Sequence, residues 1–305
     1  MNAIAQLRKD CERIGCICLA DEPMAAHTSF KIGGPADLLL KPRDAETAAR
    51  VIARARELSV PLLFIGKGSD LLICDEGVRG AVLSFDEASA RPSLRDETVI
   101  DCPAGASLTA LCCFALEQGL TGLEFAYGIP GSVGGAVYMN AGAYGGEIRD
   151  VVGSVRFLDG QGKLRVLEEC ALELSYRHSY FTDHPDCLIT SASFHLRRGD
   201  RDAIRARMDD LMERRRTKQP LEYPSAGSTF KRPKGAYASA LIDGCGLKGR
   251  RVGGAMVSEK HAGFVINYDN ASCTDVLTLI GEIQTQVRSR RAFRWNVKSS
   301  TSDSL

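Results

Sequence analysis

Apolar residues in the first part of the chain occur as short continuous runs or at helical spacing, a pattern that predicts alternating strands and helices. Three apolar runs are predicted as strands: residues 36–40, 62–66 and 71–74. Asp44 is predicted to cap a helix between the first two runs. The apolar face of that helix comprises Val51, Ile52, Ala55 and Leu58. A tight loop of polar residues and glycine then links the second and third runs, so this segment is predicted to be a small α/β unit.

The mixture of helices and strands continues beyond this unit. Ser107 is predicted to cap a helix that Gly119 closes in the left-handed conformation. Asp159-Gly160 stands between two apolar runs, which indicates a β-hairpin within residues 151–167. Residues 188–196 predict a further strand.

The composition changes at residues 197–220, which are rich in arginine. Asp202 is predicted to cap a helix here, and Pro220 ends it. Because acidic residues are interleaved with the arginines, a solvated helix face is favoured over an RNA-binding surface. We place a domain boundary near residue 200.

The C-terminal part is again a mixture of strands and helix. Strands are predicted around residues 254–257 and 264–266, and Ser272 and Asp275 form a capping-box pattern at the start of a last helix. The helix is predicted to turn five apolar residues inward: Val276, Leu279, Ile280, Ile283 and Val287.

Composition narrows the classes of protein that the chain can belong to. Of its 305 residues, 44% are hydrophobic and 25% are charged, which is typical of a soluble globular protein of one large or two modest domains. The net charge of +1 and the lack of a long apolar run give no reason to expect a nucleic-acid or membrane partner. The N-terminus has no apolar signal core, so a cytoplasmic location is expected. The eleven cysteines include no C-x-x-C pair and the five histidines no ligand pair, so we expect reduced thiols and no metal site.

Two glycine-rich loops are candidate ligand sites, GKGSD at 66–70 and GIPGSVGGAVYMNAGAYGG at 128–146. Glycine lets backbone N–H groups approach a phosphate, and Pro130 can occupy the first turn of a helix whose start adds positive potential. Neither loop matches G-x-G-x-x-G or the P-loop, which disfavours a Rossmann site and a P-loop site. The pattern alone leaves both a phosphate cradle and a structural turn open.

Two further segments carry candidate polar chemistry. In PSAGSTFKRP (224–233), small residues expose the Ser228 hydroxyl, with Lys231 three positions on. Such a pair can donate a proton or bind an anion, and a purely structural loop is the alternative. In SYRHSY (175–180), Arg177 lies between two tyrosines, where it either pairs with a carboxylate in a closed pocket or stacks on the rings at the surface.

These pieces occur in one order along the chain, and together they resemble the UDP-N-acetylenolpyruvoylglucosamine reductase (MurB) family. The stretches that carry the resemblance are TSFKIGGPAD, GKGSDLL, AGASLTALCCFALEQGLTGLEFAYGIPGSVGGAVYMNAGAYGGEI, YRHS, QPLEYPSAGSTFKRP and GLKGRRVGGAMVSEKHAGFVIN. They span roughly residues 27–287. The compact SYRHSY region, which lacks a large tyrosine-bearing insertion, is similar to the shorter, type II subgroup.

The resemblance implies an α+β fold and an enzyme. It implies a FAD-binding domain of the vanillyl-alcohol-oxidase (PCMH) type at residues 1–199, built of two α/β subdomains at roughly 1–75 and 76–199. A smaller α/β substrate-binding domain follows at residues 200–305. The implied activity is a flavin oxidoreductase with FAD as cofactor and NADPH as hydride donor. Its UDP-sugar substrate, UDP-N-acetylglucosamine enolpyruvate, would be reduced to UDP-N-acetylmuramate in peptidoglycan precursor synthesis, and a monomer is expected.

The resemblance also assigns roles to individual residues. Arg177 matches the catalytic arginine of the family and Ser228 its proton donor. Tyr176, Lys231 and Arg232 are expected to bind the substrate. The FAD site is expected to comprise Gly66, Lys67, Gly68, Ser69, Asp70, Gly128, Ile129, Pro130, Gly131, Ser132, Gly134, Gly135, Asn140, Ala141 and Gly142.

The chain departs from the family pattern at three places. The family has a catalytic glutamate near the C-terminus, whereas this chain has Asn296 or Lys298 there, depending on the register of the tail. Arg232 replaces an asparagine, and Asp70 stands where the loop usually has asparagine. The alternative function is therefore a diverged paralogue that binds FAD and is weakly active or inactive.

Overall fold

The computed structural model of the chain describes residues 2–233, 235–291 and 300–301. The chain forms two compact units. Unit 1 comprises Met1–Ala20, Asp37–Lys67 and Gly80–Arg215, and unit 2 comprises Asp21–Ala36, Gly68–Arg79 and Arg216–Leu305. Two short segments from the first quarter of the chain therefore belong with its C-terminal part.

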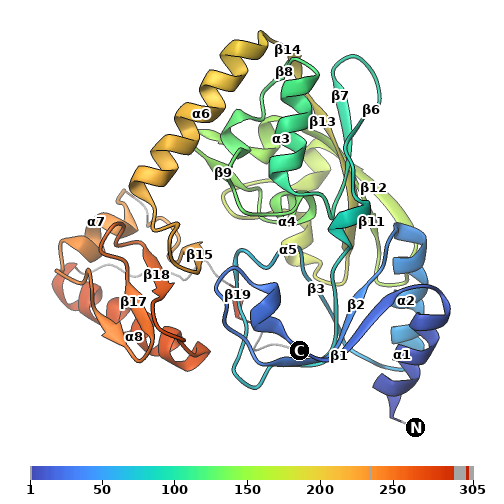
Figure 1. Cartoon of the computed structure of the whole chain (residues 1–305), viewed down its shortest axis with the longest axis horizontal. Coiled ribbons are helices and arrows are strands. Elements are labelled where there is room, and N and C mark those ends of the chain that lie inside the picture. The colour runs from blue at the N-terminus through green and yellow to red at the C-terminus, as the bar shows by residue number, and fades with distance from the viewer. Residues whose placement is uncertain (1, 234, 292–299, 302–305) are drawn as a thin grey trace. The chain divides into compact units, whose positions relative to one another are not determined.

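A first, four-stranded sheet has the strand order β1 (Ile17–Pro23), β2 (Pro35–Lys41), β5 (Val78–Leu83) and β3 (Leu62–Phe64). Helices α1 (Ala3–Arg13) and α2 (Ala45–Glu57) lie beside β1 and β2 (Figure 1). The predicted cap of α2 is confirmed, since the Asp44 carboxylate accepts the Thr47 N–H at 2.7 Å. The apolar face of α2 is buried against α1 and the sheet, so local capping and periodic burial together define this α/β layer.

A second sheet has five antiparallel strands in the order β12 (Leu164–Glu168), β11 (Val152–Leu158), β13 (Leu188–His195), β7 (Val99–Pro103) and β6 (Ser93–Leu94). It shares its core with α3 (Leu108–Glu117), α4 (Val133–Tyr138), α5 (Tyr180–Asp183) and the long α6 (Arg201–Lys218). The Ser107 hydroxyl accepts the Ala110 N–H at 3.2 Å, and Gly119 has a φ of +63°. Both predicted ends of α3 and the predicted hairpin of β11 and β12 are thereby confirmed.

Unit 2 holds a third sheet, with the order β15 (Ser225–Ser228), β18 (Phe264–Asn267), β17 (Ala255–Val257) and β16 (Arg251–Val252). Helices α7 (Ala238–Asp243) and α8 (Cys273–Arg291) complete its core. The capping box is confirmed, since Asp275 N–H donates to the Ser272 hydroxyl at 3.0 Å and Ser272 N–H to the Asp275 carboxylate at 3.1 Å. All five predicted core residues of α8 are buried, and Phe30, Ile32 and Leu72 join the same core.

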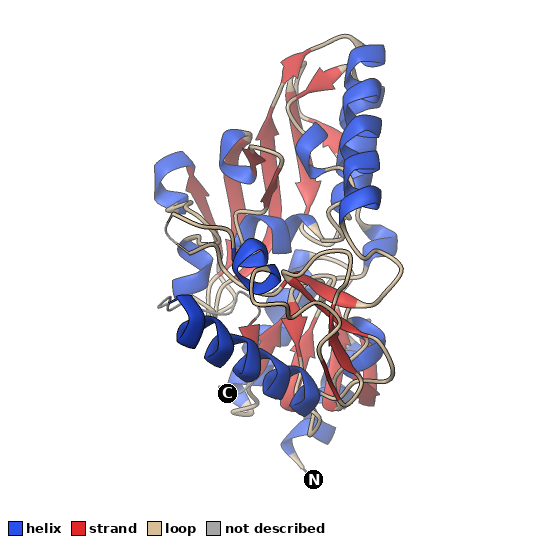
Figure 2. Ribbon diagram, turned by 90° about the vertical axis from the view of Figure 1, so that its left-hand side faces the viewer, coloured by secondary structure: helices blue, strands red, loops and turns tan. Residues whose placement is uncertain are grey.

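The remaining elements are short, and strands and helices alternate through the structure (Figure 2). The short strands are β4 (Leu71–Leu72), β8 (Leu120–Thr121), β9 (Gly142–Ala143), β10 (Gly146–Glu147), β14 (Arg197–Arg198) and β19 (Ser300–Thr301). The 3-10 turns are η1 (Met24–His27), η2 (Glu87–Ser89), η3 (Glu124–Ala126), η4 (Ile148–Asp150) and η5 (Glu169–Leu172). None of the helices in the described ranges has the length and apolarity that crossing a bilayer requires.

Local details of the sequence prediction need correction. The cap of α6 is Asp200, whose carboxylate accepts the Ala203 N–H at 2.9 Å, whereas Asp202 lies in the first turn. The predicted strand at 71–74 is confined to Leu71–Leu72. Pro130 precedes α4 instead of lying in its first turn, because Ser132 is the N-cap. The predicted ligand-binding domains, 1–199 and 200–305, remain a prediction, since the two units are defined by internal contacts alone.

Candidate active site

The loop that follows β3 keeps backbone donors that the protein does not use. The N–H groups of Lys67, Gly68 and Ser69 donate to no acceptor within the described part of the chain. The Lys67 ammonium is held at 2.9 and 2.7 Å from the two carboxylate oxygens of Glu87. Consecutive unused N–H groups form a concave surface that suits a phosphate.

Gly68 cannot be replaced by a larger residue without a collision. Its φ is +60°, and a Cβ would run into the carbonyl oxygen of His27. Ser29 N–H donates to the Gly68 carbonyl at 3.1 Å, and the Ser29 hydroxyl donates to the Ser225 carbonyl at 2.6 Å. Within unit 2, residues 27–29 thus connect the second half of the loop to β15, the strand that ends at Ser228.

The start of α4 is packed tightly against the protein's own backbone. Gly135 N–H donates to the Ser132 hydroxyl at 3.3 Å, and Gly134 N–H donates to the Ala104 carbonyl at 2.9 Å. A Cβ on Gly134 would lie 2.9 Å from the Ala104 Cβ. The N–H groups of these two glycines are therefore engaged inside the protein, and Gly134 is needed for close packing.

The hairpin formed by β9 and β10 explains further glycines of the 128–146 stretch. Tyr144 and Gly145 form its two-residue turn with φ values of +55° and +90°, the conformation of a type I′ turn. A Cβ on Gly146 would lie 2.7 Å from the Phe125 ring, and one on Gly142 would lie 2.7 Å from the Gly146 carbonyl oxygen. Much of the glycine content of this stretch therefore serves the packing of the protein on itself.

The two glycine loops meet at Gly66. A Cβ at this position would collide with the Ser132 hydroxyl and lie 3.7 Å from the Gly135 Cα. Glycine at 66 therefore lets the first loop approach the start of α4 within unit 1. Two segments that were predicted separately from the sequence are adjacent in the fold.

Asn140 is a structural residue of the second loop. Its side chain is fully buried, its φ is +39°, and its amide nitrogen donates to Glu147 at 2.7 Å and to the Ser175 carbonyl at 2.9 Å. Its amide oxygen accepts the Arg149 N–H at 2.9 Å. The amide nitrogen thus connects residues 140–149 to the segment that carries Arg177, and the amide oxygen is used within residues 140–149.

Arg177 lies at the tip of a tight turn in which Ser175 and His178 exchange N–H···O hydrogen bonds of 3.1 and 3.2 Å. Its φ of +56° is unusual for a residue with a long side chain, a strain that often accompanies functional positions. The guanidinium donates to the carbonyls of Asn140 at 3.4 Å and Gly142 at 3.2 Å. Its Nε–H is buried and has no partner among the described residues, so this N–H is one of the donors left for a ligand.

The three predicted substrate residues lie in different surroundings. Tyr176 is exposed, with its ring centroid 5.5 Å from the Arg177 guanidinium carbon. Arg232 stacks on Tyr237, with 4.3 Å from its guanidinium carbon to the ring centroid. Lys231 forms no ion pair with the residues that the structure describes.

Ser228 ends β15, opposite Phe264 of β18. Its hydroxyl makes no hydrogen bond within the described ranges. A Cβ on Gly263 would lie 3.3 Å from this hydroxyl and 3.0 Å from the Cε1 atom of His261. His261 Nδ1 accepts the Gly263 N–H at 3.2 Å, which leaves the proton of the neutral ring on Nε2, and burial lowers the pKa of His261. A neutral imidazole therefore lies beside a hydroxyl that is available to donate.

The predicted site residues are divided between the two units. Unit 1 contains Gly66, Lys67, the 128–142 residues, Tyr176 and Arg177, and unit 2 contains Gly68, Ser69, Asp70, Ser228, Lys231 and Arg232. Within unit 1, Gly66 lies against Ser132 at the start of α4, and Arg177 contacts Asn140, which follows the end of α4. Helix α4 thus links these four residues into one connected group. Asn296 and Lys298, the predicted replacements of the tail glutamate, lie outside the described residues; Ser300 of β19 pairs beside Leu71, directly after the first loop.

Sequence reasoning missed Ser29 and His261. Both lie in quoted stretches, TSFKIGGPAD and EKHAGF, but nothing local shows their roles. Ser29 acts on a strand 196 residues away, and His261 reaches Ser228 through the pairing of β15 and β18.

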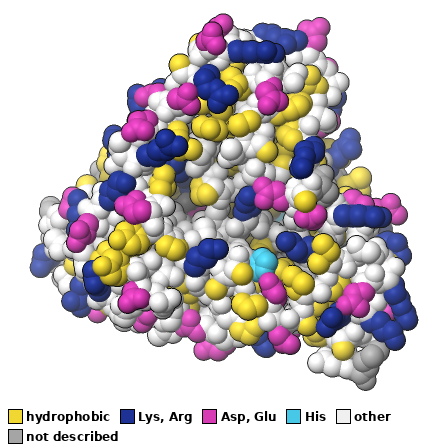
Figure 3. All heavy atoms as spheres, viewed as in Figure 1, with side chains coloured by type: hydrophobic (Ala, Val, Ile, Leu, Met, Phe, Trp, Pro, Cys, Tyr) yellow, Lys and Arg dark blue, Asp and Glu magenta, His cyan; other side chains and the backbone are white. Residues whose placement is uncertain are grey.

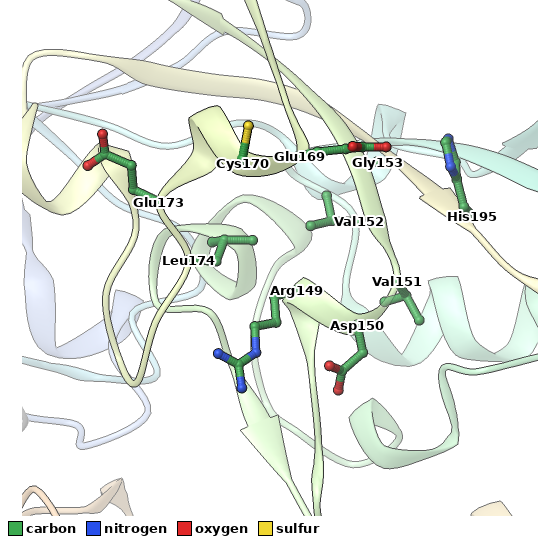
Figure 4. Close-up of a pocket in the computed structure, with 10 residues that line it drawn as sticks. All are labelled: Arg149, Asp150, Val151, Val152, Gly153, Glu169, Cys170, Glu173, Leu174 and His195. Carbon is green, nitrogen blue, oxygen red and sulfur yellow. The ribbon is translucent and has the colours of Figure 1, made fainter.

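A separate pocket of about 520 Å³ lies in unit 1 (Figure 4). Its walls come from residues 149–153, from the η5 region at 169–174 and from His195. None of the predicted site residues lines this pocket. It is therefore distinct from the connected group around Gly66 and Arg177.

The residues of the two loops fit FAD as a ligand. Lys67, Gly68 and Ser69 offer unused N–H groups to a pyrophosphate, and Arg177 offers a buried, unpaired Nε–H. Gly135 has only the Ser132 hydroxyl near its missing side chain, at 3.4 Å, so its position leaves room that the protein does not fill.

This fold and this donor set are those of a FAD-binding protein. Residues 36–168 match the model of a FAD-binding domain, and the predicted α+β class is confirmed. Residues 219–297 match the C-terminal domain of UDP-N-acetylenolpyruvoylglucosamine reductase.

Whole-length relatives define the family. The chain is 47% identical to the UDP-N-acetylenolpyruvoylglucosamine reductase of Lachnoclostridium phytofermentans, over 92% of this chain and 89% of the relative. It is also 47% identical to that of Clostridium novyi, over 91% and 88% of the two chains. The crystal structure of the Thermus caldophilus reductase (MurB) is similar, with a TM-score of 0.78, 33% identity, and coverage of 94% of this chain and 98% of that chain. The chain belongs to the UDP-N-acetylenolpyruvoylglucosamine reductase family.

Proposed function

We propose that this chain reduces the enolpyruvyl ether of UDP-N-acetylglucosamine enolpyruvate to UDP-N-acetylmuramate, with FAD as cofactor and NADPH as hydride donor. The product would serve peptidoglycan precursor synthesis. The observation that carries the proposal is the connected group of Gly66, Ser132, Asn140 and Arg177 within the matched FAD-binding region. Relatives covered over most of their length carry the name of this reductase.

The two ligands are proposed to use different parts of the chain. FAD would be held by residues of 1–199, with its pyrophosphate on the 66–70 loop, and the UDP-sugar by residues of 200–305, Lys231 and Arg232 among them. FAD supplies two-electron transfer, taking hydride from NADPH and delivering it to the substrate. Every other chemical task falls to side chains of the protein.

Arg177 is proposed to stabilise the negative charge that develops on the substrate. Addition of hydride to the methylene carbon of the enolpyruvyl group leaves an enolate of the adjoining carboxylate. A guanidinium fixed by two backbone carbonyls keeps its position as charge builds up, which is the condition for electrostatic catalysis. Its remaining Nε–H suits a carboxylate oxygen.

Ser228 is proposed to donate the proton that the adjacent carbon of the enolate requires. Its hydroxyl has no protein acceptor among the described residues, and so its proton is available. The neutral His261 imidazole, which flanks Gly263 as Ser228 does, adds a polar neighbour that is uncharged near neutral pH. A proton from solvent would restore the hydroxyl after each turnover.

We also propose a monomer in the cytoplasm without nucleic-acid or membrane partners, of the shorter, type II subgroup. Acidic and basic side chains are interspersed over most of the face drawn in Figure 3. The net charge of +1 agrees with this distribution.

An anaerobic half-reaction experiment tests the proposed function. The purified protein should carry a flavin absorbance that NADPH bleaches and that UDP-N-acetylglucosamine enolpyruvate restores without oxygen. Bleaching without reoxidation would overturn the reductase and favour the paralogue that only binds FAD. Asn296→Glu and Lys298→Glu variants extend the test, because a large rate gain in either would identify the tail as the limiting feature.

A further inference from the structure

Ser29 is a single residue that contacts two parts of the proposed site. It lies between η1 and β2 in unit 2, where it is half-buried. Its N–H donates to the Gly68 carbonyl of the 66–70 loop at 3.1 Å, and its hydroxyl donates to the Ser225 carbonyl of β15 at 2.6 Å. The backbone and the side chain of one residue therefore hold the loop and the strand that ends at Ser228.

The backbone contact of Ser29 orients a donor of the 66–70 loop. The Gly68 carbonyl and the Ser69 N–H belong to one planar peptide unit and point in opposite directions. Because the Ser29 N–H fixes the carbonyl, it also fixes the direction of the Ser69 N–H, which donates to no acceptor in the described ranges. A hydrogen bond to the carbonyl also polarises the peptide unit and strengthens its N–H as a donor.

The turn that carries Ser29 is itself anchored in unit 2. The Thr28 hydroxyl donates to the Ile32 carbonyl at 3.1 Å, and the side chains of Phe30 and Ile32 are buried in the core of this unit. The Asn267 side-chain amide of β18 donates to the Phe30 carbonyl at 3.1 Å. These contacts give the Ser29 hydroxyl a fixed position beside β15.

Strand β15 contains a β-bulge just before its last residue. Ser225 pairs with Ile266 of β18, and the next pair joins Ser228 to Phe264. Two residues of β15 thus face a single residue of β18, and one of the two, Gly227, has a φ of +74°. Bulges re-aim side chains and occur often next to active sites. The direction of the Ser228 side chain therefore depends on the geometry of this bulge.

The two ends of the bulge are held by different parts of the chain. After the bulge, Thr229 N–H donates to the Gly263 carbonyl at 2.9 Å, and the Thr229 hydroxyl accepts the Val265 N–H at 3.2 Å. These partners belong to β18 or directly precede it. At the start of the bulge, the Ser225 carbonyl accepts the hydroxyl of Ser29, a residue 196 positions away in sequence. Ser29 thus supplies a long-range anchor at one end.

We propose that Ser29 is a positioning residue, whose hydroxyl fixes the start of the bulge and so holds Ser228 where its proton reaches the enolate. This inference rests on the proposed function, in which Ser228 donates that proton. Ser29 acts through Ser228 and transfers no proton itself. Since its N–H also orients the 66–70 loop, one residue sets the position of a donor for the cofactor and of the proton donor for the substrate.

Ser29→Ala separates the two contacts, because it removes the hydroxyl and keeps the N–H. The dissociation constant of FAD and the rate of flavin reduction by NADPH should stay within about twofold of wild type. Anaerobic reoxidation by UDP-N-acetylglucosamine enolpyruvate should slow about 10- to 100-fold, because displacement of a reacting group by a fraction of an ångström has an effect of this order. Ser29→Thr, which keeps a hydroxyl, should restore the reoxidation rate.

Two further variants show whether Ser29 acts through Ser228. In a Ser228→Ala background, Ser29→Ala should not slow reoxidation further, since the group that it positions is gone. Ser272→Ala removes another hydroxyl hydrogen bond of unit 2, at the cap of α8, and should leave both half-reactions unchanged. A Ser29→Ala protein that is reoxidised as fast as wild type, or that loses both half-reactions equally, would overturn the proposal.

Amide hydrogen exchange tests the same contact in the purified full chain. Exchange at residues 226–228 should be about two- to tenfold faster in Ser29→Ala than in wild type, the effect of losing one hydrogen bond, and should be normal in Ser29→Thr and Ser272→Ala. Unchanged exchange in Ser29→Ala would overturn the proposal. The exchange measurement needs no substrate. A failure of the proposed function would instead appear as wild-type flavin that NADPH bleaches and the enolpyruvyl substrate does not reoxidise.

Discussion

The two glycine-rich loops of this chain use glycine for opposite purposes. The 66–70 loop has few glycines, yet three of its consecutive N–H groups are unused by the described protein. The 128–146 stretch has many, yet Gly134, Gly142 and Gly146 lie against other parts of the protein itself. The number of glycines therefore does not identify a ligand cradle; unengaged N–H donors do.

The longer stretch acts mainly as a scaffold for Arg177. It presents the carbonyls of Asn140 and Gly142 to the guanidinium, and the Asn140 side chain also fixes the Ser175 carbonyl at the base of the arginine turn. The 66–70 loop positions no catalytic side chain in the reaction that we propose; it is proposed only to bind the pyrophosphate of FAD. We therefore expect substitutions in the 66–70 loop to weaken FAD binding and substitutions at Arg177 to slow turnover.

The largest effect is expected from Arg177→Lys. Lysine keeps the charge but cannot donate to two carbonyls and a substrate carboxylate in one fixed plane. The turnover rate should fall about 100- to 1,000-fold, the range found when one charge-stabilising donor is removed. The dissociation constant of FAD should change less than about twofold, measured by quenching of flavin fluorescence.

The control for this variant is Arg165→Lys, since Arg165 is an exposed arginine of β12 that pairs with Asp159 in the turn before that strand. It should leave both turnover and FAD affinity unchanged. If Arg177→Lys lost FAD as severely as turnover, the 128–146 stretch would be a binding element and the contrast between the loops would be lost.

Gly68→Ala is expected to have the next largest effect, this time on FAD binding. A left-handed backbone costs a residue with a side chain about 1–2 kcal/mol, and here the new Cβ also collides with the His27 carbonyl. The loop must shift, so FAD affinity should fall at least tenfold. Gly246→Ala is the matched control, with a φ of +69° and nothing within 4 Å of its added Cβ.

The Gly68 and Gly246 variants together distinguish the cost of a left-handed backbone, which both share, from the collision of the new Cβ, which occurs only at residue 68. Gly246→Ala should lower the unfolding midpoint by a few degrees and leave FAD affinity intact. If the two variants lost FAD equally, general destabilisation would account for the effect, and the loop would have no special role in binding.

How much of this could be predicted from the sequence depends on distance along the chain. The caps at Asp44 and Ser107 and the capping box at Ser272 follow from residues within four positions of one another, and all three were predicted. The misplaced cap of α6 was an error of two residues between neighbouring aspartates.

Long-range packing was beyond the sequence pattern. Whether Gly146 serves a ligand or the Phe125 ring depends on how the β9–β10 hairpin packs on η3, which no periodicity encodes. The resemblance identified Arg177 and Ser228 as candidates, but the left-handed turn under Arg177 and the imidazole beside Ser228 appear only in the fold. Roles assigned through the resemblance remain predictions for the variants to test.

A double-mutant cycle tests the point where the loops meet. Gly66→Ala should cost about 1–3 kcal/mol through overpacking against the Ser132 hydroxyl. Ser132→Ala alone should cost about 1 kcal/mol, because it removes the cap of α4. The double variant should lose less than the sum, with a coupling of about 1 kcal/mol in thermal unfolding and in FAD affinity. Strict additivity would show that the two residues do not meet in solution.

The smallest effects are expected at two adjacent glycines, Gly134 and Gly135. Alanine at these two positions should change the free energy of unfolding in opposite directions. Gly134→Ala should destabilise the protein by about 1 kcal/mol or more, since its Cβ would lie 2.9 Å from that of Ala104. Gly135→Ala meets only the Ser132 hydroxyl at 3.4 Å and adds helix propensity, so the FAD-free protein should gain about 0.5–1 kcal/mol. If the open space beside Gly135 belongs to FAD, the same variant should bind FAD more weakly, and denaturation with and without FAD measures both quantities. A Gly135→Ala protein that is more stable and binds FAD normally would show that the open space beside Gly135 has no ligand role.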